Sequence, residues 1–297
     1  MAVDEKRAAL GGVLVVDKPA DWTSMDVCAK LRGVFHQKRV GHGGTLDPMA
    51  TGVLPVFLGQ ATRAVEYVTD GEKEYIASLR LGLTTDTQDT TGNILEERPV
   101  DVTGERLRKV LERFTGAIEQ IPPMYSAIKI DGKKLYELAR KGKEVARKPR
   151  PVTIYALELL GWPDAGEDFK LRVVCSKGTY VRTLCHDIGE TLGCGGCMSA
   201  LRRTRVGTFS IGEAVTMETL VSADDPWQFV RPVEDCFSQP AVTIKGAALR
   251  RAKNGNPFPL QRPAGEYKVF DENGDFLLLG RCDGQECRVV KSFYVDA

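Results

Sequence analysis

The stretch Gly41-His42-Gly43-Gly44-Thr45-Leu46-Asp47-Pro48-Met49-Ala50-Thr51-Gly52-Val53-Leu54 contains one carboxylate among four glycines. Pro48 lacks a backbone donor and biases Asp47 away from the helical region. The glycines let the backbone turn tightly or approach a ligand closely. The run contains no second acid, no Gly-Lys-Ser/Thr phosphate-binding motif and no pair of metal ligands. It predicts either a loop that presents Asp47 to a substrate or a structural turn in which Asp47 caps its own backbone.

The segments on both sides of this loop predict a mixed fold. Alternating or continuous apolar residues predict strands at 12–17, 52–58, 73–83, 152–160, 169–175 and 201–209. Helical spacing predicts helices at 27–34, 61–68, 103–114, 135–141, 180–192 and 217–221. Thr23-Ser24-Met25-Asp26 and Thr103 offer amino-terminal caps for the first and third of these, and Gly193 is expected to end the helix at 180–192. We therefore expect an α+β fold with a large, mainly antiparallel central sheet and flanking helices.

The last third of the chain has a different pattern. Prolines and aromatic turns between Pro226 and Pro240 indicate a boundary, and short strands are expected at 266–270, 276–281 and 288–293. Glycines separate these strands, as in a small barrel. The sequence predicts a large domain at 1–236, with a basic insertion at about 121–150, and a small barrel-like domain at 237–297.

Composition limits the class of protein. The 297 residues are 42% hydrophobic and 27% charged, as in a globular protein, and no apolar run reaches the roughly 20 residues that span a bilayer. The amino terminus lacks the apolar core of a signal peptide, so we expect a cytoplasmic protein without a membrane partner. Cys194-Gly-Gly-Cys197 has zinc or redox spacing, but no histidine lies nearby, and unpaired thiols are favoured for all eight cysteines.

The net charge of +1 conceals local basic clusters. Nine basic residues lie between Lys129 and Arg150 against three acids, a local net charge of +6. Two further clusters are Arg202, Arg203 and Arg205, and Lys245, Arg250, Arg251 and Lys253. Charge runs are often solvated faces only, but three clusters of one sign in a near-neutral chain favour a track for a polyanion.

Five segments, in order, resemble the bacterial TruB-type tRNA pseudouridine synthases. They cover residues 12 to about 210 and comprise Asp17-Lys18-Pro19 with Thr23-Ser24; Gly41–Leu54; Tyr75 with Arg80-Leu81-Gly82 and the loop 86–92; Ile121–Ala127 with Lys129 and Gly132–Tyr136; and Ser176–Leu184 with Leu192-Gly193 and Leu201-Arg202-Arg203. The resemblance implies conversion of a uridine in the T-loop of tRNA (position 55) to pseudouridine, without a metal or organic cofactor.

The same resemblance assigns roles to residues of the pocket. Asp47 is expected to start cleavage of the C–N bond as nucleophile or base. Arg182 is expected to pair with Asp47, Tyr75 to stack on the uracil, and Tyr180 and Leu201 to wall the pocket. Plain core packing is the alternative for Tyr180 and Leu201, and a structural salt bridge is the alternative for Arg182. Arg39 and Asp89 are additional candidates near the pocket.

Other residues are expected to bind the RNA. A base inside folded RNA must be flipped out, and His42 is placed to stack into the vacated position. Lys18 is expected to contact RNA or to support the Asp47 loop. The insertion is expected to grip the T-arm by phosphate contacts, through Lys129, Lys133, Lys134 and Arg140. The small domain at 237–297 matches the RNA-binding (PUA-like) domain of the family, and a monomer without an obligatory protein partner is expected.

Three alternatives remain open at this stage. The chain could be a non-catalytic RNA-binding or RNA-folding protein on the same scaffold. It could also be a guide-RNA-dependent enzyme that modifies ribosomal RNA within a complex. A metal-dependent phosphoryl-transfer enzyme could use Asp86 and Asp89.

Overall fold

A computed structural model describes residues 10–130, 132–164 and 166–294 of the chain. The chain forms two compact units, each assembled from separate stretches. Unit 1 comprises the residues up to Pro48, Leu54–Thr69 and those from Gly212 onward, and unit 2 comprises Met49–Val53 and Asp70–Ile211. The predicted boundary between 236 and 237 stays a prediction.

Unit 1 contains the strands and helices around the Asp47 loop. They are β1 (Gly12–Lys18), α2 (Ser24–Val34), β2 (Val40–His42), most of β3 (Thr51–Leu58), η1 (Gly59–Ala64), α3 (Val65–Thr69), β14 (Val215–Thr216) and α7 (Met217–Ser222). Strand β1 pairs with β14 in parallel, and β2 pairs with β3 in antiparallel orientation. Apolar side chains of β1, α2 and β3, among them Leu14, Leu31 and Leu54, form its core.

The carboxyl-terminal part of unit 1 has its own small sheet and core. Its elements are η3 (Pro226–Phe229), η4 (Val233–Cys236), β15 (Ala241–Thr243), α8 (Gly246–Lys253), β16 (Phe258–Pro259), β17 (Gly265–Phe270), β18 (Phe276–Cys282) and β19 (Glu286–Ser292). The five strands have the order β15-β17-β18-β19-β16, and Phe258, Val269 and Leu278 lie in their core. The three expected strands are confirmed. Helix α8 is not among the predicted helices, although its basic residues form the third charge cluster of the sequence.

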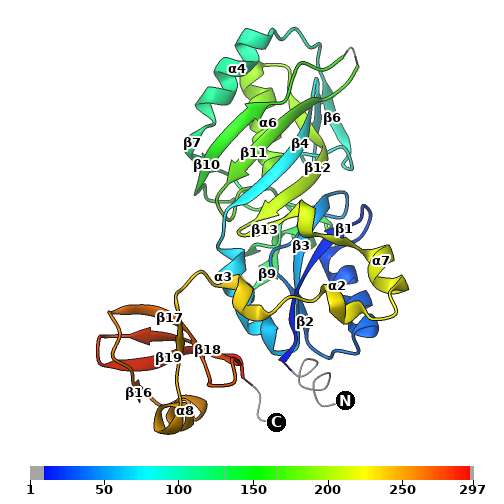
Figure 1. Cartoon of the computed structure of the whole chain (residues 1–297). Coiled ribbons are helices and arrows are strands. Elements are labelled where there is room, and N and C mark those ends of the chain that lie inside the picture. The colour runs from blue at the N-terminus through cyan, green and yellow to red at the C-terminus, as the bar shows by residue number, and fades with distance from the viewer. Residues whose placement is uncertain (1–9, 131, 165, 295–297) are drawn as a thin grey trace. The chain divides into compact units, whose positions relative to one another are not determined.

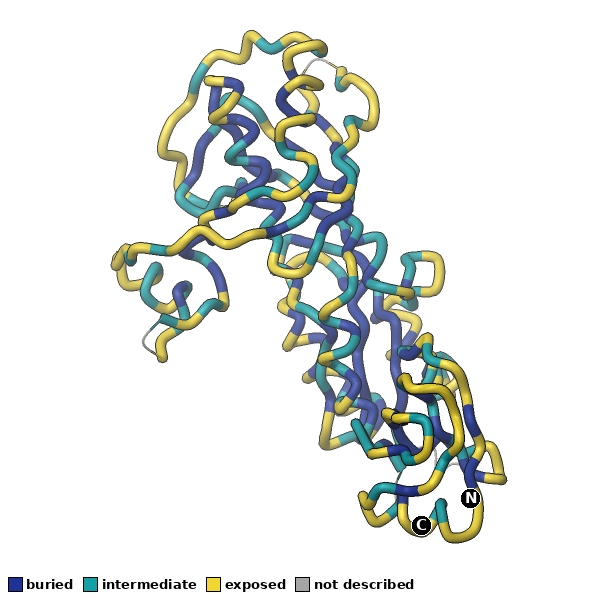
Figure 2. The backbone as a smooth tube through the Cα atoms, turned by 90° about the vertical axis from the view of Figure 1, so that its left-hand side faces the viewer, coloured by how far each residue is buried: buried dark blue, intermediate teal, exposed yellow. Residues whose placement is uncertain are grey.

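Unit 2 is built on a mainly antiparallel sheet. Its elements are β4 (Lys73–Leu81), β5 (Leu83–Thr85), β6 (Ile94–Glu97), α4 (Gly104–Arg113), β7 (Gly116–Gln120), β8 (Lys129–Ile130), β9 (Lys133–Lys134), α5 (Leu135–Ala139), β10 (Arg150–Leu159), β11 (Phe169–Cys175), α6 (Val181–Leu192), β12 (Gly196–Val206) and β13 (Phe209–Ser210); η2 (Ile211–Glu213) follows. The order in the sheet is β12-β4-β11-β10-β7. In Figure 1, α4 and α6 lie along these strands. Figure 2 marks the buried residues along the chain in dark blue.

Local sequence explains most of these elements. Strand β4 alternates buried and less buried residues along Lys73–Leu79, as a strand with one core face must. Thr23 and Thr103 cap α2 and α4 as expected, and Asp26 completes a capping box with Thr23. Helix α6 ends at Leu192 and is capped by Gly193, whose φ of 81° is readily adopted by glycine. The predicted α+β class with a large, mainly antiparallel sheet is confirmed.

Three segments differ from the sequence prediction. The helix expected at 61–68 is split into the 3-10 turn η1 and the short helix α3. The strand expected from Leu201 begins five residues earlier, at Gly196, because the buried residues Gly196, Cys197 and Met198 pair with β4. The strand expected at 73–83 is divided at Gly82 into β4 and the short strand β5, which pairs with β6.

Candidate active site

The Asp47 loop lies between β2 and β3 in unit 1, with Asp47 half-buried. Leu46, directly before Asp47, is anchored to the first residue of α2. The Leu46 N–H donates to Ser24 Oγ over 2.9 Å, and Ser24 Oγ contacts the Leu46 carbonyl oxygen at 3.3 Å. Because Ser24 and Leu46 are both buried, the capped start of α2 fixes the backbone on this side of the carboxylate.

Lys18 anchors the other side of the loop. Its Nζ donates to the carbonyl oxygens of Pro19 at 2.8 Å, Trp22 at 2.6 Å and Pro48 at 3.1 Å. The Asp21 N–H also donates to the Pro48 oxygen, over 2.9 Å. Lys18 is 0% exposed, so its ammonium group is enclosed among these backbone carbonyls. Its role in holding the loop or in contacting RNA stays a prediction.

His42 and Gly43 form the entry to the loop. His42 ends β2 opposite Val56 and is half-buried. The Gly43 N–H donates to the Pro55 carbonyl oxygen over 2.8 Å. A Cβ at Gly43 would lie 3.2 Å from the Val68 side chain of α3, so the loop packs closely against that helix. His42 is thus placed beside the loop as expected, and its contact with RNA stays a prediction.

Two predicted pocket residues lie on neighbouring strands of unit 2. Tyr75 of β4 is opposite Arg203 of β12, and Leu201 is opposite Ala77. Residues two apart on a strand share a face, so Tyr75 and Leu201 lie on the same face of the sheet. Both are largely buried, with 7% and 8% of their surfaces exposed. The structure therefore brings this part of the expected pocket wall together.

Arg182, in the first turn of α6, forms a buried network. Its Nη1 lies 3.2 Å from Asp89 Oδ2 and 3.2 Å from the Thr87 carbonyl oxygen, and its Nη2 donates to the Tyr125 carbonyl oxygen over 2.8 Å. Arg182 and Asp89 are 6% and 3% exposed. This ion pair joins residues 93 positions apart. One of them, Asp89, is expected from the sequence only as an additional candidate near the pocket.

Asp89 is itself held by its own loop. Its Oδ1 accepts hydrogen bonds from Thr87 Oγ1 at 2.8 Å, from the Thr91 N–H at 3.0 Å and from Thr91 Oγ1 at 2.5 Å. The carboxylate is therefore satisfied on one oxygen by the threonines and on the other by Arg182. The pairing of Arg182 with Asp47 stays a prediction, since the two residues belong to different units.

The expected RNA-binding cations lie on the segment between β7 and β10. Lys129 and Lys133 are exposed on the β8–β9 hairpin, where Lys129 pairs with Lys134. Lys134 Nζ and the Arg140 guanidinium each lie 5.4 Å from the centre of the Tyr136 ring. Such cation–π contacts restrain long side chains at little cost in solvation. Tyr136 therefore organises two of the four predicted cations.

The second basic cluster, Arg202, Arg203 and Arg205, is only partly exposed. Arg203 is 1% exposed, and its Nε donates to the Val53 carbonyl oxygen over 2.7 Å. Its charge contributes to the interior of unit 2, so Arg202, Arg203 and Arg205 do not form the continuous basic track that the charge pattern suggests. Burial of Lys73 lowers the pKa of its ammonium group below its usual range, and the charge of Arg203 lowers it further.

The cysteines are all free thiols, as the sequence indicates. Burial raises the pKa of the Cys197 thiol to about 11 and also raises that of Cys194. Neutral, buried thiols are poor nucleophiles and poor metal ligands. Among the residues that the structure describes, no group of three or more His, Cys, Asp or Glu side chains is arranged to hold a metal ion.

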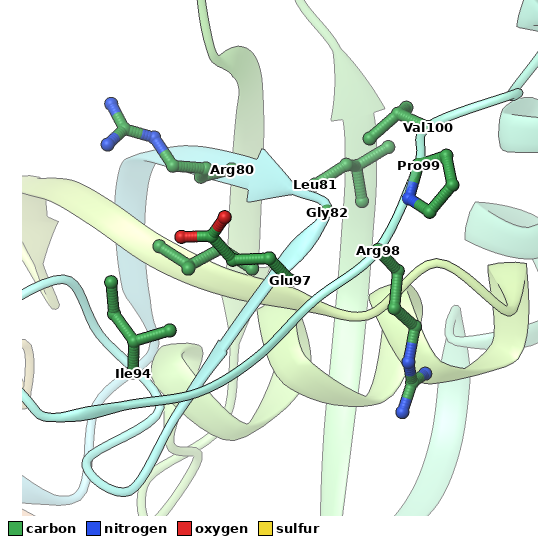
Figure 3. Close-up of a pocket in the computed structure, with 9 residues that line it drawn as sticks. Arg80, Leu81, Gly82, Ile94, Glu97, Arg98, Pro99 and Val100 are labelled. Carbon is green, nitrogen blue, oxygen red and sulfur yellow. The ribbon is translucent and has the colours of Figure 1, made fainter.

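A surface hollow of about 630 Å³ lies beside the turn that joins β4 to β5 (Figure 3). Its lining includes Arg80, Glu97 and Arg98 together with exposed Ile94 and Val100. Arg80 is bound to Asp168, and Arg98 to Glu96. The hollow includes none of the predicted site residues. Within the described part of the chain, no helix has the length and apolarity to cross a bilayer.

Comparisons with known proteins agree with this architecture. The TruB family pseudouridylate synthase N-terminal domain matches residues 32–181, and the tRNA pseudouridylate synthase B C-terminal domain matches residues 182–238. These matches place the chain among the pseudouridine synthases. The chain belongs to the TruB family.

Individual relatives are similar over nearly their whole length. The tRNA pseudouridine synthase B of Aromatoleum aromaticum is 44% identical, with 94% of this chain and 91% of the relative covered. That of Azoarcus sp. is 46% identical, with 92% of each covered. That of Clostridium kluyveri is 38% identical, with 96% of this chain and 100% of the relative covered.

Solved structures show the same fold in larger assemblies. A chain in the crystal structure of a Cbf5-Nop10-Gar1 complex has a TM-score of 0.73 and 28% identity, covering 98% of this chain and 87% of that one. A chain of an H/ACA RNP bound to a substrate RNA containing 2'-deoxyuridine has a TM-score of 0.73 and 26% identity, with the same coverage.

Proposed function

We propose that this enzyme converts a uridine in the T-loop of tRNA (position 55) to pseudouridine. The observation that carries the proposal is the Asp47 loop: both neighbours of the carboxylate are anchored, Leu46 by Ser24 and Pro48 by Lys18. Relatives at 44% and 46% identity are named tRNA pseudouridine synthase B, which supports tRNA as the substrate.

The reaction needs one well-placed carboxylate and no redox partner. The bond from C1' of the ribose to N1 of uracil breaks, the base rotates, and a bond from C1' to C5 forms. The proton on C5 leaves to solvent, and N1 gains a proton, so atoms and charge balance. Asp47 starts this sequence as nucleophile or base, because a carboxylate can add covalently and leave again.

The residues of unit 2 are proposed to complete the pocket. Arg182 pairs with Asp47 and keeps it ionised; a guanidinium has five N–H donors, so its bonds to Asp89, Thr87 and Tyr125 are compatible with this role. Tyr75 stacks on the uracil. Tyr180 and Leu201 wall the pocket.

The remaining residues are proposed to hold the RNA. His42 fills the place that the flipped base leaves, and Lys18 supports the Asp47 loop. Lys129, Lys133, Lys134 and Arg140 contact phosphates of the T-arm, which position the RNA without reading its sequence. The domain at 237–297 adds affinity for tRNA. The enzyme acts in the cytoplasm as a monomer.

A tRNA transcript labelled with tritium at uracil C5 tests the proposal. The purified protein alone should release tritium in proportion to one uridine per tRNA, and the release should vanish when that T-loop uridine is replaced by cytidine. Absence of release from the unmodified transcript would show that the chain is not a stand-alone tRNA enzyme.

The fold shared with a chain of the Cbf5-Nop10-Gar1 complex supports one second candidate, a guide-dependent enzyme for ribosomal RNA. The same assay separates the two. A guide-dependent enzyme is silent on bare tRNA and releases tritium only when a guide RNA pairs with the labelled RNA. Binding of tRNA without release in either assay indicates the non-catalytic alternative.

A further inference from the structure

The start of helix α6 is held by a side chain from strand β7. Tyr180 is the residue before α6, and its own side chain forms no cap. Instead, the Tyr180 N–H donates to Gln120 Oε1 over 3.0 Å, and Gln120 Nε2 donates to the Tyr180 carbonyl oxygen over 3.3 Å. Gln120 is 1% exposed, so both ends of its amide are committed to one backbone residue, away from water.

Gln120 also lies where the basic insertion joins the sheet. It is the last residue of β7, and its partner across the sheet is Arg150, the first residue of β10. The chain leaves the sheet after Gln120 and returns at Arg150, so the whole insertion is attached at this pair. Pro122, two residues after Gln120, is buried, and its carbonyl oxygen accepts a hydrogen bond from Arg147, near the end of the insertion.

The backbone that Gln120 grips continues directly into the Arg182 network. The Tyr180 carbonyl oxygen also accepts the Leu184 N–H over 3.0 Å, which makes it part of the first turn of α6. Arg182 and Thr183 project from that turn to the loop at 87–89, where Thr183 Oγ1 donates to Gln88 Oε1 over 2.7 Å. A shift of the Tyr180 backbone therefore moves Arg182 as well, since a helical turn is stiff.

We propose that Gln120 is a positioning residue for the reaction: its amide fixes Tyr180 and, through the first turn of α6, Arg182, at the point where the basic insertion joins the sheet. The inference rests on the proposed function. Gln120 acts on turnover, because it holds pocket residues and is itself buried away from the RNA-binding surface.

Two substitutions separate the amide's chemistry from its volume. Gln120→Met keeps the length of the side chain and removes both hydrogen bonds. Gln120→Glu keeps the acceptor for the Tyr180 N–H but, when ionised, places an oxygen against the Tyr180 carbonyl oxygen. Burial and this repulsion raise the pKa of such a carboxyl above its usual value of about 4.3. Protonated, it can donate as the amide does.

The matched control is at the other end of the same helix. Arg106 Nη2 donates to the carbonyl oxygen of Leu192, the last residue of α6, over 2.7 Å. Arg106→Met removes a backbone anchor of α6 without touching Tyr180 or Arg182. It reports what a general loosening of the helix does to turnover.

The test measures tritium release at saturating tRNA, the dissociation constant for tRNA and the melting temperature for each variant. Gln120→Met should lower turnover about tenfold or more and leave tRNA binding within about twofold, whereas Arg106→Met should keep turnover within about twofold. For Gln120→Glu, turnover relative to wild type should rise at least about threefold from pH 8 to pH 6. The ratio for Gln120→Met should stay flat.

Three results would overturn the inference: wild-type turnover by folded Gln120→Met, an equal loss in Arg106→Met, or a pH-independent ratio for Gln120→Glu. If Gln120→Met does not fold, the pH ratio of Gln120→Glu decides alone. Failure of the proposed function is seen separately, because the wild-type protein would then release no tritium.

Discussion

The Asp47 loop and the Arg182 network reach a fixed geometry in different ways. In the loop, the anchors Ser24 and Lys18 bind the backbone of Leu46 and Pro48. In the network, the Arg182 side chain binds Asp89 directly, together with two backbone carbonyls. In the loop, the contacts hold the backbone on either side of Asp47. In the network, the functional side chain of Arg182 makes the contacts itself.

This difference predicts how each region responds to substitution. The contacts of Leu46 with Ser24 and of Pro48 with Lys18 do not involve the Asp47 side chain, so they should remain when that side chain changes. Removal of the Arg182 side chain leaves Asp89 buried without its partner, so both activity and stability should fall.

The largest effect is expected from Asp47→Asn. The variant should lose pseudouridine formation, because an amide is neither a nucleophile nor a base of the required strength. It should fold normally and bind tRNA within a few-fold of wild type. Tritium release and filter binding measure the two quantities. Near-normal turnover would contradict the assignment of Asp47.

Arg182→Met should also lose most turnover and, in addition, about 3 kcal/mol in the free energy of unfolding. Arg172→Met is the control: its bonds to Glu74 and Glu158 are partly exposed, so the loss there should be at most about 1 kcal/mol. Urea titration compares them.

The double variant Arg182→Met/Asp89→Asn sharpens the comparison. Removal of both charges should restore part of the lost stability, because no buried charge is left unpaired. Turnover should stay low. If turnover returns together with stability, Arg182 has only a structural role and the salt-bridge alternative from the sequence is correct.

Lys18→Met tests whether the loop is set by its anchors. Loss of three hydrogen bonds to carbonyl oxygens should cost about 2 kcal/mol in the free energy of unfolding and lower turnover about tenfold. The dissociation constant for tRNA should change by less than about twofold, since Lys18 is buried.

Lys177→Met is the matched control, because Lys177 and its partner Asp70 are both more than half exposed. Its unfolding free energy should stay within about 0.5 kcal/mol of wild type. A large loss of tRNA affinity in Lys18→Met with normal turnover would instead support a direct RNA contact.

Much of the fold could be predicted because it depends on local pattern. Alternation defined β4, threonine caps defined the starts of α2 and α4, and Gly193 defined the end of α6. The identity of Asp47 as the distinctive acid of the loop also followed from neighbouring residues.

The rest depends on contacts between distant segments, which no local pattern encodes. The Arg182–Asp89 pair spans 93 positions, and the Gln120–Tyr180 clamp spans 60. Burial of Lys18 and Arg203 could not be predicted either, because cations are usually exposed and only the carbonyl oxygens around them make burial possible.

A smaller effect, on binding alone, is expected from neutralising Lys133, Lys134 and Arg140 together. The apparent Michaelis constant for tRNA should rise and its salt dependence should flatten, by about one log–log unit or less per lost phosphate contact. Turnover at saturating tRNA should change little, because these cations belong to neither the loop nor the network. An unchanged slope would show that the cluster is only a solvated face.

The smallest effect on chemistry is expected from deleting the tail from Pro240 onward. The tail has its own sheet and core, so the remaining chain should fold and keep its turnover at saturating tRNA, with weaker binding because a linked binding site is lost. Contacts of α3 with residues near and within the tail bear on this prediction.

The ring centroids of Tyr67, in α3, and Phe237 lie 5.2 Å apart, and Phe237 packs on Phe276 and Phe293. Lys291 also pairs with Glu66 of α3.

These contacts connect the tail to the Asp47 loop through one helix, because Val68 of α3 lies against Gly43. The truncated protein should therefore carry Phe237→Ser, which removes an aromatic side chain that deletion would expose. The full-length Phe237→Ser variant is the control for that substitution. If the truncated protein is soluble but inactive at saturating tRNA while the control is active, α3 needs the tail to hold the loop, and the tail then contributes to positioning as well as to affinity.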